Sequence, residues 1–507
     1  RQTRSYLKGV TAKERSSPRC SEICEKLLCH VYRRGNKPRS TWLGVGWNNM
    51  RKIPGYGVYN LGKSVKTGTS QEFEVVRKKL ELVRNLLETM SNLVARLKQS
   101  SILHLLLAIT FFVSGLIINI IQCLLYFGVR PFSRYLFRKI NYYLSYSMYS
   151  QVVFLAEWWS NSNVVVYSDK EEFDKYCGKE HGYLLMNHRY EIDWLMGWFF
   201  CERMSLLGNC KTYAKKSIQY VPILGWAWKF GECIFLERSW EKDKEIIGRQ
   251  IRELVDYPDS MWLLLMAEGT RFTHEKHEAS KIFAREKGLP QLNHHLVPRT
   301  KGFTSSIPYL RGKPAAVYDI QIAFKKYKDG VPKKQLVQQM IKNFRSDKEP
   351  TVMRMLLGLP VEAHLYVERI PLEQIPEEEE ACARWLHELY QKKDRMQDSF
   401  FKTDDFFAES GVKRVDGFNL KRRPVSLLNT VIWGFVILVP MSCYLIGLFT
   451  CGSWFYFSAG VSILSVFFLL LSKMIGMTKI SEASSYGKTS AALTSESKSS
   501  SVTKKID

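Results

Sequence analysis

Two stretches of this sequence contain no Asp, Glu, Lys or Arg: residues 102–129 and residues 427–471. Each is longer than the roughly 20 apolar residues that a helix needs to cross a bilayer. A buried core helix is the alternative, but globular helices rarely run so far without a charged residue. The sequence therefore predicts a multi-pass membrane protein, with one hydrophobic segment at 102–129 and a two-span hairpin at 427–472.

The region between these stretches, residues 130–401, has the alternation typical of a soluble α/β domain. Short apolar runs predict strands, and longer amphipathic patterns predict helices. The predicted strands are residues 164–167, 183–186, 233–236, 262–266, 316–323 and 363–367. The predicted helices include residues 239–255 and 378–391. We therefore expect a catalytic α/β domain with membrane segments on both sides of it.

The first hundred residues carry much of the positive charge. They contain 21 Lys and Arg against 7 Asp and Glu, an excess of 14 in a chain whose formal net charge is +25. No zinc-finger, RRM-like or basic-zipper pattern accompanies them, so we expect no nucleic acid partner. Residues 1–70 are predicted to be a disordered basic arm, either solvated or attracted to anionic lipid headgroups. Residues 402–426 are predicted to be a linker, and residues 473–507 a disordered tail.

Residues 71–100 show a different pattern. Apolar side chains recur at spacings of three and four from Phe73 to Leu97, which is the a/d repeat of a coiled coil. Self-association through residues 73–97 is one interpretation. An amphipathic helix that lies on the membrane or on the catalytic domain is the other, and it is favoured because this segment leads directly into a hydrophobic one.

A histidine and an aspartate stand five residues apart just after the apolar run 183–186. Asp193 can fold back in a loop or first helical turn and accept a hydrogen bond from one ring nitrogen of His188. The other nitrogen is then free to act as a base. We predict that His188 is a general base and that Asp193 orients it.

A second polar motif, Glu268-Gly269-Thr270-Arg271, follows the predicted strand 262–266. The guanidinium of Arg271 matches phosphate oxygens in a bidentate fashion. Gly269 lets the backbone come close to a ligand, and Thr270 can donate a hydroxyl hydrogen bond. Glu268 either holds an arginine in place or binds a glycerol hydroxyl. We predict that this motif binds a phosphorylated substrate.

Together the two motifs resemble motifs I and III of the glycerolipid acyltransferase family. Residues 231–238 and 297–302 resemble its motifs II and IV. From about residue 100 to 480 the chain is similar to the animal 1-acylglycerol-3-phosphate acyltransferases of the gamma/delta type. It departs from many members at Met266-Ala267, where they have Phe-Pro.

The resemblance implies a mixed sheet flanked by helices. It also implies that Arg238 is a second phosphate-binding residue and that Pro298 shapes the wall of the acyl site. Three lysines are further candidates for the phosphates of coenzyme A: Lys215, Lys216 and Lys301.

The expected reaction moves a fatty acyl group from acyl-CoA to the sn-2 hydroxyl of lysophosphatidic acid, giving phosphatidic acid. Direct transfer is the simpler mechanism, because no cysteine adjoins His188 in the sequence. No cofactor is expected besides acyl-CoA as co-substrate, and no metal, because no zinc-like spacing of Cys and His occurs. Alternatives are another acceptor, such as lysophosphatidylinositol, and a catalytically silent membrane scaffold.

The flanking charges predict how the chain lies in an endoplasmic reticulum membrane. Lysines and arginines flank the hairpin at both ends, which places the catalytic domain and the C-terminal tail on the cytosolic side. A single crossing by residues 102–129 would put the basic arm in the lumen. A re-entrant loop that bends near Gly115 would keep the arm cytosolic, and about 28 residues are compatible with either arrangement. Re-entry or partial immersion is the favoured interpretation, and a full crossing is the alternative.

Overall fold

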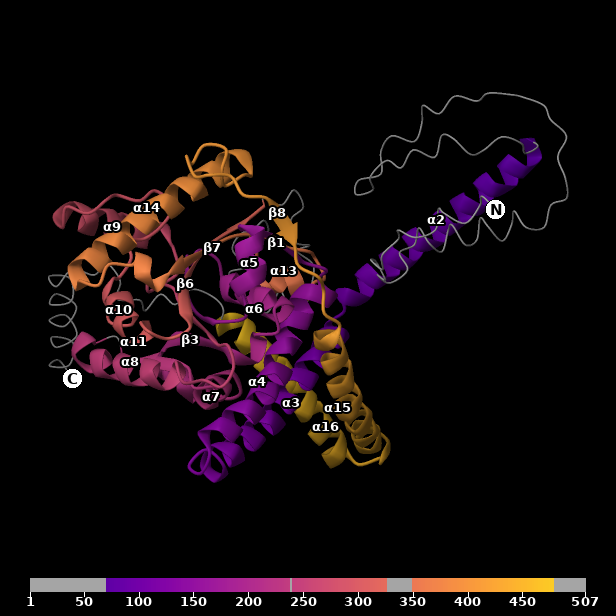
Figure 1. The fold of residues 1–507 in the computed structure, drawn as a ribbon. Coiled ribbons are helices and arrows are strands. Elements are labelled where there is room, and N and C mark those ends of the chain that lie inside the picture. The colour runs from indigo at the N-terminus through magenta and orange to yellow at the C-terminus, as the bar shows by residue number, and fades with distance from the viewer. Residues whose placement is uncertain (1–69, 238, 326–348, 478–507) are drawn as a thin grey trace, which may run out of the picture. The chain divides into compact units, whose positions relative to one another are not determined.

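The computed structural model describes residues 70–237, 239–325 and 349–477 (Figure 1). The predicted arm at 1–70, apart from residue 70, lies outside the described residues, and so does the predicted tail beyond residue 477. The chain divides into two compact units, residues 1–92 and 93–507. Helix α2 (Ser70–Lys98) covers the predicted heptad segment, and its apolar side chains from Leu82 to Leu97 are exposed. Self-association through this helix stays a prediction.

The second unit is built on one mixed sheet of eight strands, in the order β4-β3-β5-β2-β6-β7-β1-β8. All neighbours are parallel except β6 with β7 and β1 with β8. The strands are β1 (Asn163–Tyr167), β2 (His181–Met186), β3 (Cys210–Lys215), β4 (Ile234–Leu236), β5 (Trp262–Leu265), β6 (Ala315–Phe324), β7 (Glu362–Pro371) and β8 (Gly417–Asn419). The predicted fold class, a mixed sheet in an α/β domain, is confirmed.

The six predicted strands are all present, and the structure adds β3 and β8. The sequence of β3 contains two lysines and a threonine and shows no apolar run, which is why it does not stand out. It forms a strand because β4 and β5 pair with it on either side. Strand β8 falls within residues 402–426, which the sequence suggested to be a linker, and pairs with β1.

The central strand β2 is buried on both faces, and its side chains alternate between two cores. Leu184 and Met186 join the core that faces α4 and α6. Tyr183 and Leu185 join the opposite core, which contains residues of α8, α10 and α14. This three-layer packing fixes the loops that follow the carboxyl ends of β2 and β5, where the sequence motifs lie.

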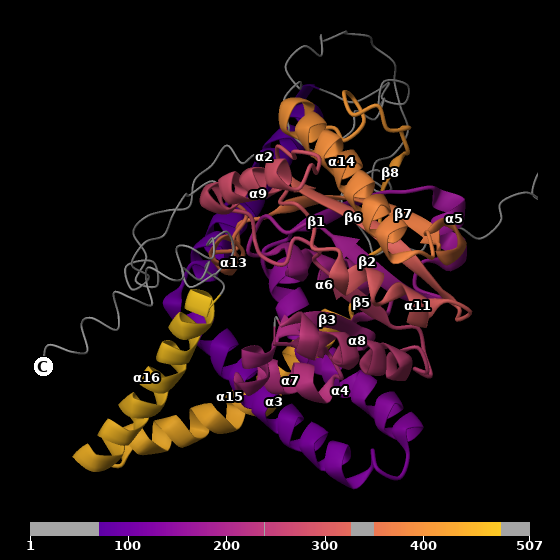
Figure 2. The same ribbon diagram turned by 90° about the vertical axis from the view of Figure 1, so that its left-hand side faces the viewer.

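The helices of this unit cover both faces of the sheet, and Figure 2 shows α14 lying across β6 and β7. The described helices between the membrane segments are α4 (Arg134–Phe154), α5 (Lys170–Tyr176), α6 (Asp193–Arg203), α7 (Leu224–Phe230), α8 (Trp240–Leu254), α9 (His274–Glu286), α10 (Lys301–Thr304), α11 (Ile307–Leu310), α13 (Val352–Leu356) and α14 (Glu379–Thr403). A short π-helix, η1 (Leu155–Trp159), follows α4, and three short 3-10 helices are η2 (Leu207–Asn209), η3 (Lys216–Tyr220) and η4 (Leu372–Gln374).

Three helices of the described residues are long and apolar enough to cross a membrane: α3 (Ser101–Gly128), α15 (Val425–Thr450) and α16 (Trp454–Met477). Only residues 451–453 separate α15 from α16, and the two helices contact each other. Their apolar side chains are largely exposed, which suits contact with lipid. These helices support a membrane protein.

Helix α3 is different, because half of its most apolar stretch is buried inside the protein. Its polar side chains face α4: Gln122 Nε2 donates to Asn141 Oδ1 at 2.9 Å, and Gln151 Nε2 donates to Ser114 Oγ at 2.9 Å. Later positions in α3 thus pair with earlier positions in α4. The two helices therefore run antiparallel, joined by the turn at residues 129–133.

The predicted bend near Gly115 is wrong, because α3 runs unbroken through this residue. The glycine has a packing role instead. A Cβ atom at this position would lie 2.6 Å from Cγ2 of Ile223, closer than such contacts allow. The absent side chain therefore lets α3 approach the segment just before α7.

Candidate active site

His188 and Asp193 lie together where β2 ends and α6 begins. His188 Nδ1 is 3.1 Å from Asp193 Oδ2. The carboxylate can only accept, so Nδ1 carries the proton and Nε2 keeps its lone pair. Asp193 is fully buried, whereas 20% of the His188 side chain is exposed and lines a large cavity. The pair can therefore present a basic nitrogen to a molecule in that cavity.

The same oxygen of Asp193 also organises the turn between the two residues. It accepts the backbone N–H groups of Arg189 at 2.7 Å and Tyr190 at 2.8 Å. The five-residue spacing therefore corresponds to one turn of the chain, which the carboxylate of Asp193 closes by hydrogen bonding to residues at its start. This closure holds the imidazole ring and the start of α6 in a fixed relation.

Glu268 occupies a position that neither sequence interpretation anticipated. Its two carboxylate oxygens accept the backbone N–H groups of His188 at 2.8 Å and Leu296 at 3.1 Å. Glu268 is 1% exposed and does not line the cavity, and no arginine of the described residues forms an ion pair with it. Burial raises the pKa of Glu268 to about 8, against the opposing effect of these two N–H donors. We therefore assign Glu268 a role in positioning His188.

Backbone hydrogen bonds join the loops further. The N–H of Phe272 donates to the carbonyl of His188 at 3.0 Å, and that of Arg299 donates to the carbonyl of Ala267 at 2.7 Å. Gly269 has a φ of +71°, and a Cβ atom there would lie 3.0 Å from Cδ of Arg299. A side chain at this position would be both strained and crowded. Three loops that are distant in the sequence thus form one rigid rim.

This rim opens on a cavity of about 1,320 Å³. Two kinds of side chain predominate in its lining. Aromatic and aliphatic side chains form one part: Trp194, Trp198, Phe200, Ile218, Trp228, Leu236 and Trp262. Cations form the other: Lys211, Lys215, Arg271, Lys276, Lys287, Arg299 and Lys301. Such a cavity can hold a long apolar chain and several phosphate groups at once.

Arg271 lines this cavity together with His188 and Thr270. Burial lowers the pKa of the Arg271 guanidinium from its ordinary value, while Glu191 and Asp193 oppose this effect. Thr270 Oγ1 accepts a hydrogen bond from Lys276 Nζ at 2.8 Å, which leaves the hydroxyl proton available to a ligand. The basic nitrogen of His188 and cationic groups therefore line the same cavity.

Comparison with known proteins identifies the family. Residues 164–306 match the family model described as Acyltransferase, and residues 354–433 match the one described as Acyltransferase C-terminus. The chain is 40% identical over 396 residues to the 1-acyl-sn-glycerol-3-phosphate acyltransferase gamma of Homo sapiens. It is 42% identical over 396 residues to the delta enzyme of Bos taurus. Each alignment covers 78% of this chain and 97% of the relative. The chain belongs to the 1-acyl-sn-glycerol-3-phosphate acyltransferase family. It is an acyltransferase.

Among the other residues that the acyltransferase motifs suggested, Pro298 and Lys301 line the cavity. Lys301 also lies 5.0 Å from the ring centre of Trp240. Lys215 lines the cavity, whereas Lys216 pairs with Glu237 outside it. Of these two neighbouring lysines, only Lys215 is therefore placed to meet a ligand in the cavity.

Arg238 lies outside the described residues, so its predicted role stays untested. The residues beside it are fixed: the backbone N–H of Glu237 donates to Asp243 Oδ1 at 2.8 Å, at the start of α8. Three cations that line the cavity were not predicted from the sequence: Lys276, Lys287 and Arg299. Only Arg299 had a local signal, because it stands inside the motif IV match.

Proposed function

We propose that this protein transfers a fatty acyl group from acyl-CoA to the sn-2 hydroxyl of 1-acylglycerol-3-phosphate, making phosphatidic acid. The observation that carries the proposal is that His188, whose Nε2 has no hydrogen-bond partner among the described residues, lies on the wall of a cavity that is both apolar and cationic. Relatives named as 1-acyl-sn-glycerol-3-phosphate acyltransferases support the acceptor.

The chemistry needs few groups. Nε2 of His188 takes the proton of the acceptor hydroxyl as its oxygen attacks the thioester carbonyl carbon. The carbon–sulfur bond then breaks, and the coenzyme A thiolate leaves with the proton that His188 returns. Such a base contributes on the order of 10²–10⁴-fold to the rate. No covalent acyl-enzyme is required.

The cavity suggests where each part of the substrates lies. Arg271, next to the base, would bind the phosphate of lysophosphatidic acid. The other cations at the cavity, among them Lys215, Lys276 and Lys301, would meet the phosphates of coenzyme A. The tryptophans and Phe200 would enclose the acyl chain, with Pro298 contributing to the cavity wall.

We place the enzyme in the endoplasmic reticulum membrane, with the catalytic domain facing the cytosol. Acyl-CoA is a cytosolic metabolite, and cations flank the α15–α16 hairpin at both ends, as expected for cytosolic flanks. The apolar helices α3, α15 and α16 support attachment to a membrane.

A substrate panel tests the proposal. The purified full chain is incubated with labelled acyl-CoA and with lysophosphatidic acid, lysophosphatidylinositol or lysophosphatidylcholine. We expect labelled phosphatidic acid as the main product. A preference for lysophosphatidylinositol would keep the mechanism and replace the acceptor. Absence of any acyl transfer would leave the silent scaffold as the better explanation.

A further inference from the structure

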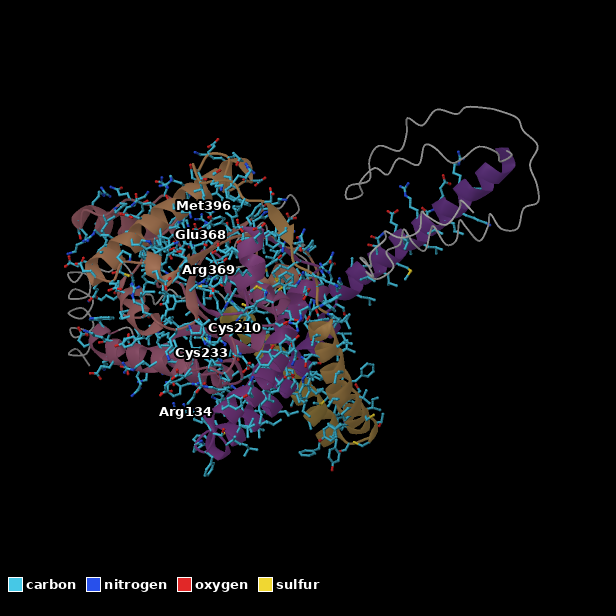
Figure 3. The ribbon with its side chains drawn as sticks, viewed as in Figure 1. Arg134, Cys210, Cys233, Glu368, Arg369 and Met396 are labelled. Carbon is cyan, nitrogen blue, oxygen red and sulfur yellow. The ribbon has the colours of Figure 1, made fainter. Side chains whose placement is uncertain are left out.

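A second cavity, of about 480 Å³, lies on the side of α8 that carries Arg249 and Arg252. It shares no lining residue with the large cavity. Its lining comes from the start of α4, from α8 and from the loop after α8: Arg134, Tyr135, Arg138, Arg249, Arg252, Glu253, Asp256 and Pro258. Figure 3 labels Arg134 at the lower end of the α3–α4 pair, below Cys210 and Cys233, which line the large cavity.

Positive charge predominates here, with four arginines against two carboxylates. Arg249 and Arg252 make no ion pair with any residue that the structure describes. Arg252 stacks on the ring of Tyr309 at 4.9 Å. Arg134 lies 3.7 Å from Glu253, a carboxylate that Arg130 approaches at the same distance. The cavity thus holds guanidinium groups whose charge is not fully compensated.

Arg138 forms the fixed wall of this cavity. It is 4% exposed, and its Nε donates to Glu232 Oε2 at 2.8 Å. Its Nη1 donates to the carbonyl of Asp256 at 3.3 Å, and its guanidinium lies 4.3 Å from the ring centre of Tyr257. A site that is anchored in this way needs little reorganisation when a ligand binds.

The surface beside the cavity is apolar. Phe132, in the turn between α3 and α4, is 89% exposed, and Tyr135, which lines the cavity, is 64% exposed. Leu124 and Phe127, at the end of α3, are exposed as well. Aromatic rings next to arginines at the end of an apolar helix are the composition of a membrane interface.

We infer that this cavity binds the phosphate of an anionic membrane phospholipid, whose acyl chains lie against the exposed apolar surface of the α3–α4 turn. A guanidinium cluster matches phosphate oxygens, and basic pockets beside membrane helices are suited to lipid headgroups. Free phosphate would satisfy the arginines but would make no use of Phe132 and Leu124. The site is separate from the one proposed for catalysis.

Helix α8 gives this second site a connection to the first. One side of α8 lines the large cavity with Trp240, Asp243 and Ile247. The last turns line the second cavity with Arg249 and Arg252. A lipid held there would fix the catalytic domain against the bilayer that supplies its acceptor.

The test measures lipid binding by the full chain in an uncharged detergent, with His188→Ala as background so that no lipid is consumed. The probes are dihexanoyl phosphatidylserine, dihexanoyl phosphatidylcholine and inorganic phosphate. Binding is followed as a rise in melting temperature with ligand concentration. We expect phosphatidylserine to bind and phosphatidylcholine to bind more weakly, because phosphatidylserine has a net negative charge whereas the choline cation of phosphatidylcholine offsets its phosphate.

Arg249→Glu should weaken phosphatidylserine binding at least about tenfold, because a charge-assisted contact becomes a repulsion. Lys244→Glu makes the same change of charge on α8 but lines neither cavity, so it should bind as the parent does. Arg252→Gln serves as a milder second variant if Arg249→Glu does not fold.

Three results would overturn the inference. Equal binding by the parent and both arginine variants would exclude the cavity. Loss of binding in Arg271→Ala, with Arg249→Glu unaffected, would place the lipid in the large cavity instead. Equal stabilisation by inorganic phosphate and by phosphatidylserine would show a site for free phosphate rather than for lipid.

Discussion

At the scale of single residues, the position of His188 depends on three separate contacts. Asp193 accepts from its ring, Glu268 accepts from its backbone N–H, and Phe272 donates to its carbonyl. Only the first contact involves the reactive ring. The contact with Asp193 should therefore control which ring nitrogen of His188 carries the proton. The two backbone contacts should control where the residue lies.

The first prediction concerns the ring contact. His188→Ala and Asp193→Asn should each abolish acyl transfer while membrane insertion and expression are kept, because the base or its orienting partner is lost. Initial rates with labelled acyl-CoA check this. His274→Ala, which removes an exposed histidine outside the cavity, is the control. Retention of more than a few per cent of activity by His188→Ala would remove it as the base.

Arg271→Ala should raise the KM for lysophosphatidic acid far more than that for acyl-CoA. Losing a charge-assisted phosphate contact costs about 1.5–3 kcal/mol, which is roughly a 10- to 150-fold weaker interaction. Steady-state kinetics with each substrate varied in turn measure the two constants. Equal effects on both would mean that Arg271 organises the whole site, and an effect on acyl-CoA alone would end the headgroup assignment.

Glu268 should give the protein a pH-dependent stability. Burial raises its pKa from 4.5 to about 8, so between these values the folded protein holds a proton that the unfolded chain releases. The contribution of Glu268 to the free energy of unfolding is therefore fully present below pH 4.5 and is lost as the pH rises through 8. Glu268→Gln cannot ionise, so its melting temperature should fall less between pH 5 and 8.5.

Melting curves of detergent-purified protein across this range test that prediction. The exposed Glu278→Gln on α9 is the matched control and should follow the parent protein. Parallel curves for Glu268→Gln and the parent would show that Glu268 is ionised in the folded state throughout.

At the scale of helices and strands, patterns that depend on neighbours in sequence were predictable and those that depend on distant partners were not. The apolar runs of β2 and β5 and the His188–Asp193 turn are local. Strand β3 needs β4 and β5 to pair with it, and Glu268 meets Leu296 only when two loops come together. The cavity cations Lys276 and Lys287 stand on and after α9, with no motif around them.

Helix α3 illustrates the same limit. Its lack of charge predicted a membrane segment, but the sequence alone did not show that its amides face α4. Asn119 Nδ2 donates to Gln122 Oε1 at 3.1 Å, and Gln122 Nε2 donates to Asn141 and Ser145. All four side chains are buried. This polar seam is what separates α3 from a helix surrounded only by lipid.

The seam gives a prediction for stability. Gln122→Leu would remove one hydrogen bond from the buried Asn119 and one from the buried Asn141. Each buried group left unsatisfied lowers the stability by about 1–3 kcal/mol. We expect a clearly lower melting temperature. Leu124→Ala, on the exposed face of the same helix, should lower it much less. A larger effect of Leu124→Ala would mean that lipid contact, and not the seam, holds α3 in place.

At the scale of the whole molecule, the proposed membrane topology rests on two helical hairpins. The α15–α16 pair turns at residues 451–453, so a hairpin that crosses the bilayer here would return the chain to the side that it left. The α3–α4 pair turns at residues 129–133, and α4 belongs to the core of the catalytic domain. In the proposed topology, the antiparallel contact of α3 with α4 takes the place of the bend that the sequence suggested.

We therefore predict that tags at both ends of the chain are accessible to protease in sealed microsomes. A full crossing by α3 would pull Gln122 and Ser114 away from their partners in α4, which stays with the catalytic domain. It would also move the basic first hundred residues into the lumen, against the positive-inside rule. A lumenal marker protein, digested only after detergent is added, is the control. Protection of the C-terminal tag would refute the α15–α16 hairpin, and protection of the N-terminal tag would show that α3 crosses alone.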